Sequence, residues 1–145
     1  MATLTPETVA WMLANDYDSD NINRVGAHGN SALMKAVREA RADMSKELIA
    51  AGADLEISNV DGNTALWNAC FGQEYRCVEA LVQAGCNLDK QNDNGVTALM
   101  YSASAGKEDM VKLLLEHGAD KEIKNLDDFK AIDLAVTAKI YRLLK

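Results

Sequence analysis

The sequence predicts an all-α solenoid, in which short helix-turn-helix units stack on one another and extended finger loops join them. Three observations predict this fold. The chain of 145 residues repeats itself at an offset of 33 residues, and its glycines follow the same period. Its helical segments are shorter than the ~12–15 residues at which isolated helices become marginally stable. Helices this short are stable only when they stack on neighbouring units.

Three similar strings carry the repeat, and each begins at a loop glycine. They are GNSALMKAV from Gly29, GNTALWNAC from Gly62 and GVTALMYSA from Gly95. A second glycine follows each of these by 23 residues, after an apolar run, at Gly52, Gly85 and Gly118. Glycine adopts the left-handed conformation that ends a helix without steric cost. We therefore expect each of the later glycines to end a helix.

The first helix of each unit is predicted from its start and its apolar spacing. A hydroxyl side chain stands between the loop glycine and the apolar series in all three units, at Ser31, Thr64 and Thr97. Such an oxygen can accept a hydrogen bond from an amide of the first helical turn. Leu66, Ala69 and Cys70 then follow at helical spacing, so one face of a short helix is expected to be buried.

A second helix is expected after a few polar residues. Its buried face is predicted to consist of three apolar residues in each unit, namely Met44, Leu48 and Ile49, then Cys77, Leu81 and Val82, then Met110, Leu114 and Leu115. The segment after each closing glycine, such as residues 53–63, holds isolated apolar residues among Asn and Asp. That composition is typical of an extended, turn-rich finger.

Both ends of the chain are expected to form capping units. Thr5 is predicted to cap a first helix that has Pro6 in its first turn, and Leu4 is predicted to pack on Val9. Near the other end, residues 131–135 repeat the first-helix pattern, and a last apolar helix follows. Terminal units of a stacked array need one polar outer face.

These residues resemble the ankyrin repeat. The string Asn-x-x-Gly-x-Thr-Ala-Leu, the run Met-Val-Lys-Leu-Leu-Leu-Glu-His-Gly-Ala-Asp and the period of 33 residues are all similar to the pattern of that family. The resemblance implies a single ankyrin-repeat domain over residues 1–145. Its expected parts are an N-terminal capping unit (about residues 1–26), full repeats (27–59, 60–92 and 93–125) and a C-terminal capping unit (126–145).

The sequence also departs from the pattern of the family. The family's proline is alanine in all three units. The resemblance implies that the family's histidine links neighbouring fingers by hydrogen bonds. In this chain the histidine position is occupied by Met34, Trp67 and Met100. We expect those bonds to be missing or to be replaced by apolar packing. The family's glycine between the two helices is kept as Gly106, but its equivalents are Ala40 and Gln73, where we expect the helix turns to differ.

The resemblance implies that the chain binds a partner protein through a concave face, built from finger tips and the exposed sides of the first helices. Carried over position by position, that face contains Lys35, Arg38, Val60, Asp61, Asn63, Asn68, Phe71, Asp93, Asn94, Val96, Tyr101, Ser104, Asp127 and Phe129. Exposed aromatic residues make strong interface anchors. Phe71, Tyr101 and Phe129 are therefore the first candidates, and packing within the fold is the alternative for each.

The fingers carry most of the net charge. The chain has 22 acidic and 15 basic residues, a net charge of −7, and fingers 53–63, 86–96 and 119–129 contain nine of the acids and three of the bases. This balance provides no basic surplus for binding nucleic acid, whereas it could steer a basic partner protein. Turn chemistry, which itself favours Asp and Asn, is the alternative explanation for the acids.

The sequence offers little for catalysis. It contains two histidines and no phosphate loop, dinucleotide fingerprint or zinc-protease motif. We therefore expect a non-catalytic chain that needs no cofactor. The hypotheses for its function are a protein-binding adaptor, an inhibitor or immunity-type protein that occludes a specific enzyme and, more remotely, a small enzyme.

An acidic cluster and three cysteines leave further alternatives. Asp16, Asp18 and Asp20 match the start of a calcium loop, but Ala27 occupies the position of the bidentate Glu, so a solvated acidic loop is the alternative. No two of the three cysteines lie close enough in sequence to form the paired spacing of a metal site. This favours small apolar core thiols over a metal or redox site. No secretory leader or membrane span is expected. We predict a monomer in the cytoplasm, an intracellular and reducing compartment.

Overall fold

The computed structural model describes residues 3–145. Met1 and Ala2, the first residues of the segment considered for a leader, lie outside the described residues. Within residues 3–145 the chain forms α-helices and short 3₁₀ helices and no β-strand, so the all-α class is confirmed. The chain divides into two compact units, which are Met1–Cys86 and Asn87–Lys145.

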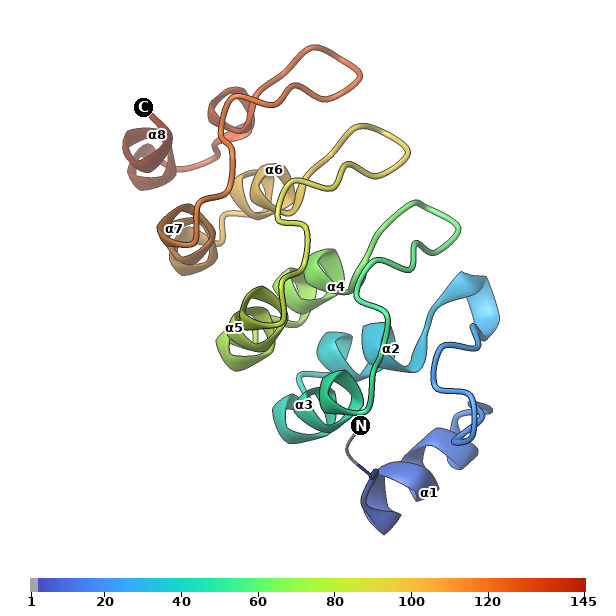
Figure 1. Cartoon of the computed structure of the whole chain (residues 1–145). Helices are drawn as coiled ribbons and strands as arrows, with labels where there is room; N and C mark the ends of the chain where they lie inside the picture. Colours follow the sequence, from blue (N-terminus) through green and yellow to red (C-terminus); the bar gives the residue numbers. More distant parts are fainter. Residues whose placement is uncertain (1–2) are drawn as a thin grey trace. The chain divides into compact units, whose positions relative to one another are not determined.

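The first unit contains an N-terminal helix and two helical pairs. Its elements are α1 (Pro6–Ala14), the 3₁₀ helix η1 (Ala27–Gly29), α2 (Ala32–Arg38), α3 (Ala42–Ala50), α4 (Ala65–Gly72) and α5 (Tyr75–Gln83) (Figure 1). Helix α2 packs on α4, and α3 packs on α5. Contacts of α2 with α3 and of α4 with α5 join the two layers. The first helices thus form one layer of this unit and the second helices form the other.

The second unit repeats this arrangement with a shortened final pair. Its elements are α6 (Ala98–Ser104), α7 (Glu108–Glu116), the 3₁₀ helix η2 (Ala131–Leu134) and α8 (Ala138–Leu144). Helix α6 packs on η2, and α7 packs on α8. The segment that repeats the first-helix pattern near the C-terminus is therefore one 3₁₀ helix of four residues.

The helix starts follow the hydroxyl residues. The Oγ atom of Ser31 accepts a hydrogen bond of 3.2 Å from the amide of Met34, and Thr97 caps α6 in the same way. Thr5 caps α1 through the amide of Thr8. Thr64 occupies the N-cap position of α4, but its side chain makes no capping hydrogen bond. The predicted caps are confirmed except for that one bond.

The residues that end or reverse the helices share a left-handed backbone. The closing glycines have φ values of 96° at Gly52, 90° at Gly85 and 92° at Gly118, as predicted. The turn between the two helices of each pair is also left-handed, with φ of 61° at Ala40, 57° at Gln73 and 73° at Gly106. The prediction that Ala40 and Gln73 change this turn is therefore wrong. The packed helices on both sides hold these residues in a conformation that glycine adopts more easily.

The buried core follows the predicted stripe of the first helices, where Leu33, Leu66 and Leu99 are at most 3% exposed. Met34 and Met100 are each 1% exposed, which confirms apolar packing at two of the family's histidine positions. The predicted face of the second helices is confirmed in part. Leu48, Leu81 and Leu114 are fully buried, and so are Cys77 and Met110. Met44, Ile49, Val82 and Leu115 are only half-buried, whereas Ser45, Val78 and Val111, which were not predicted, are buried.

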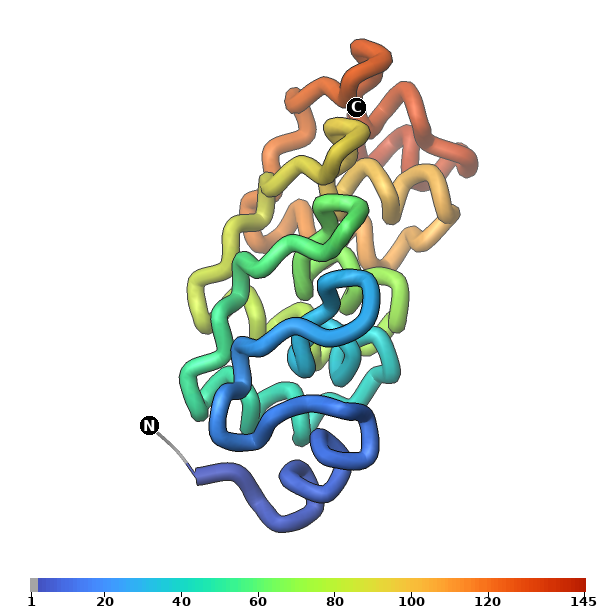
Figure 2. The backbone as a smooth tube through the Cα atoms, turned by 90° about the vertical axis from the view of Figure 1, so that its right-hand side faces the viewer, coloured from blue at the N-terminus to red at the C-terminus, as the bar shows by residue number. Residues whose placement is uncertain are grey.

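The fingers within one unit lie side by side. In the first unit the amide of Asp54 donates to the side-chain oxygen of Asn23 at 2.8 Å. In the second unit the amide of Asp120 donates to Asp89 at 2.8 Å. Figure 2 shows loops 15–30 and 53–63 (blue and green) running next to each other. Within each unit, neighbouring fingers therefore support one another through backbone donors and side-chain oxygens.

Candidate functional site

Each finger tip is shaped by one asparagine. The Oδ1 atom of Asn59 accepts hydrogen bonds from the amides of Asp61 at 3.0 Å and Asn63 at 3.1 Å. Asn92 and Asn125 make the same pair of bonds in their own fingers. This is the local hydrogen-bonding chemistry of an Asx turn. The tips are therefore held in a fixed conformation by their own side chains.

Neighbouring tips of one unit are also joined by backbone hydrogen bonds. The amide of Val60 donates to the carbonyl of His28 at 2.9 Å, and the amide of Leu126 donates to the carbonyl of Asn94 at 3.1 Å. At Gly95 a Cβ atom would lie 2.8 Å from the nitrogen of Leu126. Glycine is needed there because the next finger approaches its backbone too closely for a side chain.

The tips expose apolar side chains beside carboxylates. Val60 is 64% exposed and Leu126 is 75% exposed. Asp61 and Asp127, the residues that follow them, are exposed as well. Phe129 is 48% exposed at the end of the last finger, so it is a surface aromatic as expected. Among the remaining predicted tip residues, Asp93 and Asn94 are exposed and Val96 is half-buried.

The predicted first-helix residues of the first unit come together around Phe71. The guanidinium carbon of Arg38 lies 3.9 Å from the centre of the Phe71 ring, which is cation–π geometry. The Phe71 ring stacks on Trp67 at a centroid distance of 6.1 Å and an interplanar angle of 11°. Phe71 is 44% exposed. Both alternatives for this residue are therefore partly right, since one part of the ring packs and another part faces solvent.

A polar cavity of about 410 Å³ lies beside this cluster. It is lined by Lys35, Arg38 and Asn68 from the helices and by residues of the first loop (residues 15–30), among them Asp16, Tyr17, His28 and Asn30. Burial raises the pKa of Tyr17, and Glu39 raises it further. Lys35 forms a 2.9 Å ion pair with Glu39. Tyr17 and Asp16 could not be assigned to this site from the repeat pattern, because they belong to the irregular first loop and have no equivalent in the repeats.

Two predicted contact residues are buried instead of exposed. Asn68 is 2% exposed and Asn63 is 7% exposed. Asn68 donates to the carbonyl of Thr64 at 3.0 Å and accepts a hydrogen bond from Arg38 at 3.2 Å. The expectation that these asparagines are exposed is therefore wrong. Asn68 instead orients an arginine that does face solvent.

The first-helix residues of the second unit are less exposed. Tyr101 is half-buried, and the ammonium group of Lys107 lies 5.7 Å from the centre of its ring. Ser104 is exposed, but its hydroxyl donates to the carbonyl of Tyr101 at 2.9 Å. Tyr101 therefore offers less surface to a partner than Phe71 or Phe129.

The acidic residues near the first loop do not come together as cation ligands. Asp16 lines the polar cavity beside Arg38, whereas Asp20 lines a different cleft. Asp18 accepts a hydrogen bond of 2.9 Å from the amide of Asp20, which is turn chemistry. Within residues 3–145 no group of three or more His, Cys, Asp and Glu side chains is arranged to hold a metal ion.

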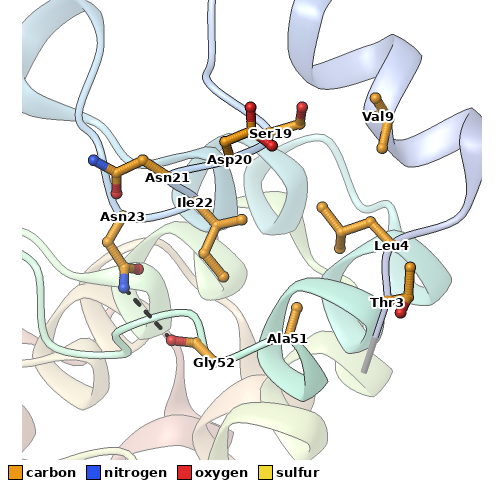
Figure 3. Close-up of a pocket in the computed structure, with 10 residues that line it drawn as sticks. All are labelled: Thr3, Leu4, Val9, Ser19, Asp20, Asn21, Ile22, Asn23, Ala51 and Gly52. Carbon is orange, nitrogen blue, oxygen red and sulfur yellow. Dashed lines mark hydrogen bonds between the residues drawn. The ribbon is translucent and has the colours of Figure 1, made fainter. Parts of the chain in front are cut away.

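The cleft that contains Asp20 has an apolar floor. Leu4, Val9 and Ile22 point toward its centre, with Ala51 at the base and the polar residues 19–21 along one edge (Figure 3). The side-chain amide of Asn23 closes the lower side through a 3.5 Å hydrogen bond to the carbonyl of Gly52. This cleft lies where the first loop meets the end of α3.

Burial affects the thiols of the cysteines. Cys70 and Cys77 are fully buried. Burial raises the pKa of Cys77 and raises the pKa of Cys86 to about 12, with Glu56 adding to the latter effect. Thiols with raised pKa values are poor nucleophiles at neutral pH, in line with small core residues.

The family model for ankyrin repeats (3 copies) matches this chain over residues 2–92, 40–125 and 73–144. The chain belongs to the ankyrin repeat family. Ankyrin repeats are generally protein–protein interaction modules, and proteins built from them are typically non-catalytic. No curated protein matches this ankyrin repeat chain in sequence. Among its described residues, no helix combines the length and apolar character that a membrane span requires.

Proposed function

We propose that this chain binds a partner protein through the finger tips and the exposed sides of the first helices of each unit, and that the contacted surface is basic and partly apolar. The observation that carries the proposal is the pairing of exposed apolar side chains with carboxylates at the tips. Val60 precedes Asp61, and Leu126 precedes Asp127. Interfaces combine such apolar contacts with polar groups that fix orientation.

The tip carboxylates are not explained by turn chemistry. In the fingers, Asp54, Asp89 and Asp120 accept backbone hydrogen bonds, so these acids do serve the turns. At the tips that task belongs to the asparagines. Among the described residues, Asp61, Asp93 and Asp127 take part in no ion pair. Their negative charge is therefore available to steer a positively charged surface.

A capture experiment tests this proposal. The wild-type chain and a variant with Asp61→Asn, Asp93→Asn and Asp127→Asn are used as baits in one lysate, and bound proteins are identified by mass spectrometry. The matched control carries Glu79→Gln, Asp109→Asn and Glu116→Gln, which remove the same charge from exposed positions on the second helices. We expect the tip variant to lose partners that the control retains.

The outcome can contradict the proposal in two ways. If both variants lose the same partner proteins, binding depends on net charge alone. If both variants retain them, the partners bind to another surface. The melting temperatures of the three baits must agree for either comparison to count. Among retained partners, a single reproducible hydrolase or toxin would indicate an inhibitor, whereas several weaker partners would indicate an adaptor.

A further inference from the structure

Arg38 in the first unit is oriented before any partner binds. Its Nη1 atom donates to the Oδ1 atom of Asn68 at 3.2 Å, and its guanidinium carbon lies 3.9 Å above the Phe71 ring. Asn68 is itself fixed, because it is buried and its amide nitrogen donates to the carbonyl of Thr64. A buried amide and an aromatic ring therefore hold one arginine in a single orientation.

Arg38 has more N–H donors than Asn68 uses, and it forms no ion pair with a carboxylate of the described residues. A guanidinium group has five N–H donors, of which Asn68 takes one. The carboxylate nearest in sequence, Glu39, is shared by Lys35 at 2.9 Å and Arg41 at 2.8 Å. No carboxylate in the described part of the chain forms an ion pair with Arg38.

The cavity beside Arg38 suits a small polar group. Its volume is about 410 Å³, and Asn15, Asn30 and His28 line it together with Arg38 and Lys35. Asp16 is the one carboxylate among its lining residues. The charged residues of the lining are thus two cations, Lys35 and Arg38, and one anion, so the cavity favours a negatively charged group.

We propose that Arg38 binds the carboxylate of an Asp or Glu side chain that the partner protein inserts into this cavity. The inference rests on the proposed function, since it needs a protein partner, and it names a specificity contact for that partner. A planar guanidinium binds a carboxylate through two parallel hydrogen bonds. Because Arg38 is already oriented, little side-chain freedom is lost when the carboxylate binds.

This contact complements the acidic finger tips. The tips select basic residues of the partner, whereas Arg38 selects one acidic residue. A segment that carries both signs in the right order is favoured, and a uniformly basic or uniformly acidic surface is disfavoured. The two preferences can be read separately in one selection experiment.

The probe is a library of random peptides displayed on phage with their C-termini fused to the coat protein, so that any selected carboxylate belongs to a side chain. The full chain is the target, as wild type, as Arg38→Gln and as Arg24→Gln. Arg24 is an exposed loop residue of the same unit, so its variant removes the same charge elsewhere. We expect wild type and Arg24→Gln to enrich peptides with Asp or Glu at one fixed position, and Arg38→Gln to lose that enrichment.

One selected peptide and its Glu→Gln or Asp→Asn counterpart then give a quantitative test by calorimetry. Arg38→Gln should weaken the acidic peptide by about tenfold or more, the scale of a hydrogen bond to a charged group, and should leave the affinity of the neutral peptide unchanged. Arg38→Lys should also weaken the acidic peptide, because an ammonium group cannot form the bidentate contact.

Two results would overturn the inference without touching the proposed function. One is a set of selected peptides rich in Lys or Arg with no acidic position. The other is an acidic position that Arg38→Gln enriches as strongly as wild type does. Failure of the wild-type chain to select any peptide, together with no captured partner, would count against the proposed function itself.

Discussion

The hydroxyl of Thr8 in α1 donates a hydrogen bond of 2.7 Å to the carboxylate of Glu47 in α3. The same carboxylate accepts a 2.9 Å hydrogen bond from the backbone nitrogen of Thr5. Burial opposes ionisation of Glu47, but these hydrogen bonds hold its pKa below its usual value. Glu47 therefore attaches the start of the N-terminal helix to the first helical pair.

Replacement of Glu47 by Gln is expected to lower the free energy of unfolding by about 1 kcal/mol at neutral pH, because a charged acceptor is lost. A carboxyl group with a lowered folded-state pKa stabilises the fold above its unfolded-state pKa, and this contribution is lost as the pH falls through the folded-state pKa. The difference between wild type and Glu47→Gln should therefore shrink in acid. Urea unfolding at a series of pH values measures this difference in the free energy of unfolding. A difference that stays constant with pH would contradict the role of the ionised Glu47 carboxylate.

The left-handed turns at Ala40 and Gln73 make a second prediction. A residue with a side chain is strained in this conformation, by about 1 kcal/mol or more relative to glycine. Replacement by glycine relieves this strain and so stabilises the folded state. Part of that stabilisation is lost, because glycine also makes the unfolded chain more flexible. Ala40→Gly and Gln73→Gly should each raise the melting temperature, and Gly106→Ala, at the equivalent turn, should lower it. Opposite signs in thermal melts would show that the turns are not strained.

Gly72 is predicted to be required for the approach of α4 to α2. A Cβ atom at this position would lie 2.6 Å from the carbonyl oxygen of Val37 and 2.8 Å from that of Arg38. Both contacts are to backbone, which cannot rotate away. Gly72→Ala should cost about 1–3 kcal/mol of stability, as overpacking does, and should displace Phe71 from Arg38. An unchanged melting curve would contradict this packing.

Phe71 and Leu66 on α4 are predicted to have opposite roles. Phe71→Ala should weaken partner capture and leave the melting temperature within a few degrees, because 44% of this residue is exposed. Leu66 is 3% exposed, so Leu66→Ala should cost ~2–5 kcal/mol as a buried truncation. A collapse in stability for Phe71→Ala would show that its ring belongs to the core.

Much of the fold could be predicted from local sequence. Ser31, Thr97 and the closing glycines each act within one turn of backbone, and the structure confirms them. The turn at Gln73 could not be predicted in this way, because helix packing overrides the preference of a single residue. The burial of Ser45 on α3 could not be predicted for a similar reason, since serine is polar and its burial follows from the helices beside it.

The candidate site was predicted residue by residue, but its internal contacts were not. The sequence predicts Arg38 and Phe71 as two independent contact residues, although they are 33 residues apart and so occupy equivalent positions in adjacent repeats. Stacking of repeats brings equivalent positions close together, so the period itself was the signal for this contact. Burial of Asn63 and Asn68 depends on side-chain direction, which a positional comparison does not contain.

Hydrogen exchange of the chain with and without a captured partner tests the central claim most directly. The claim is that a protein binds at the finger tips and first helices. Binding should slow exchange of the amides in residues 59–63, 92–96 and 125–129 and at the exposed ends of α2 and α4, and leave α3, α5 and α7 unchanged. Protection confined to α3, α5 and α7, with unaltered finger tips, would contradict the account.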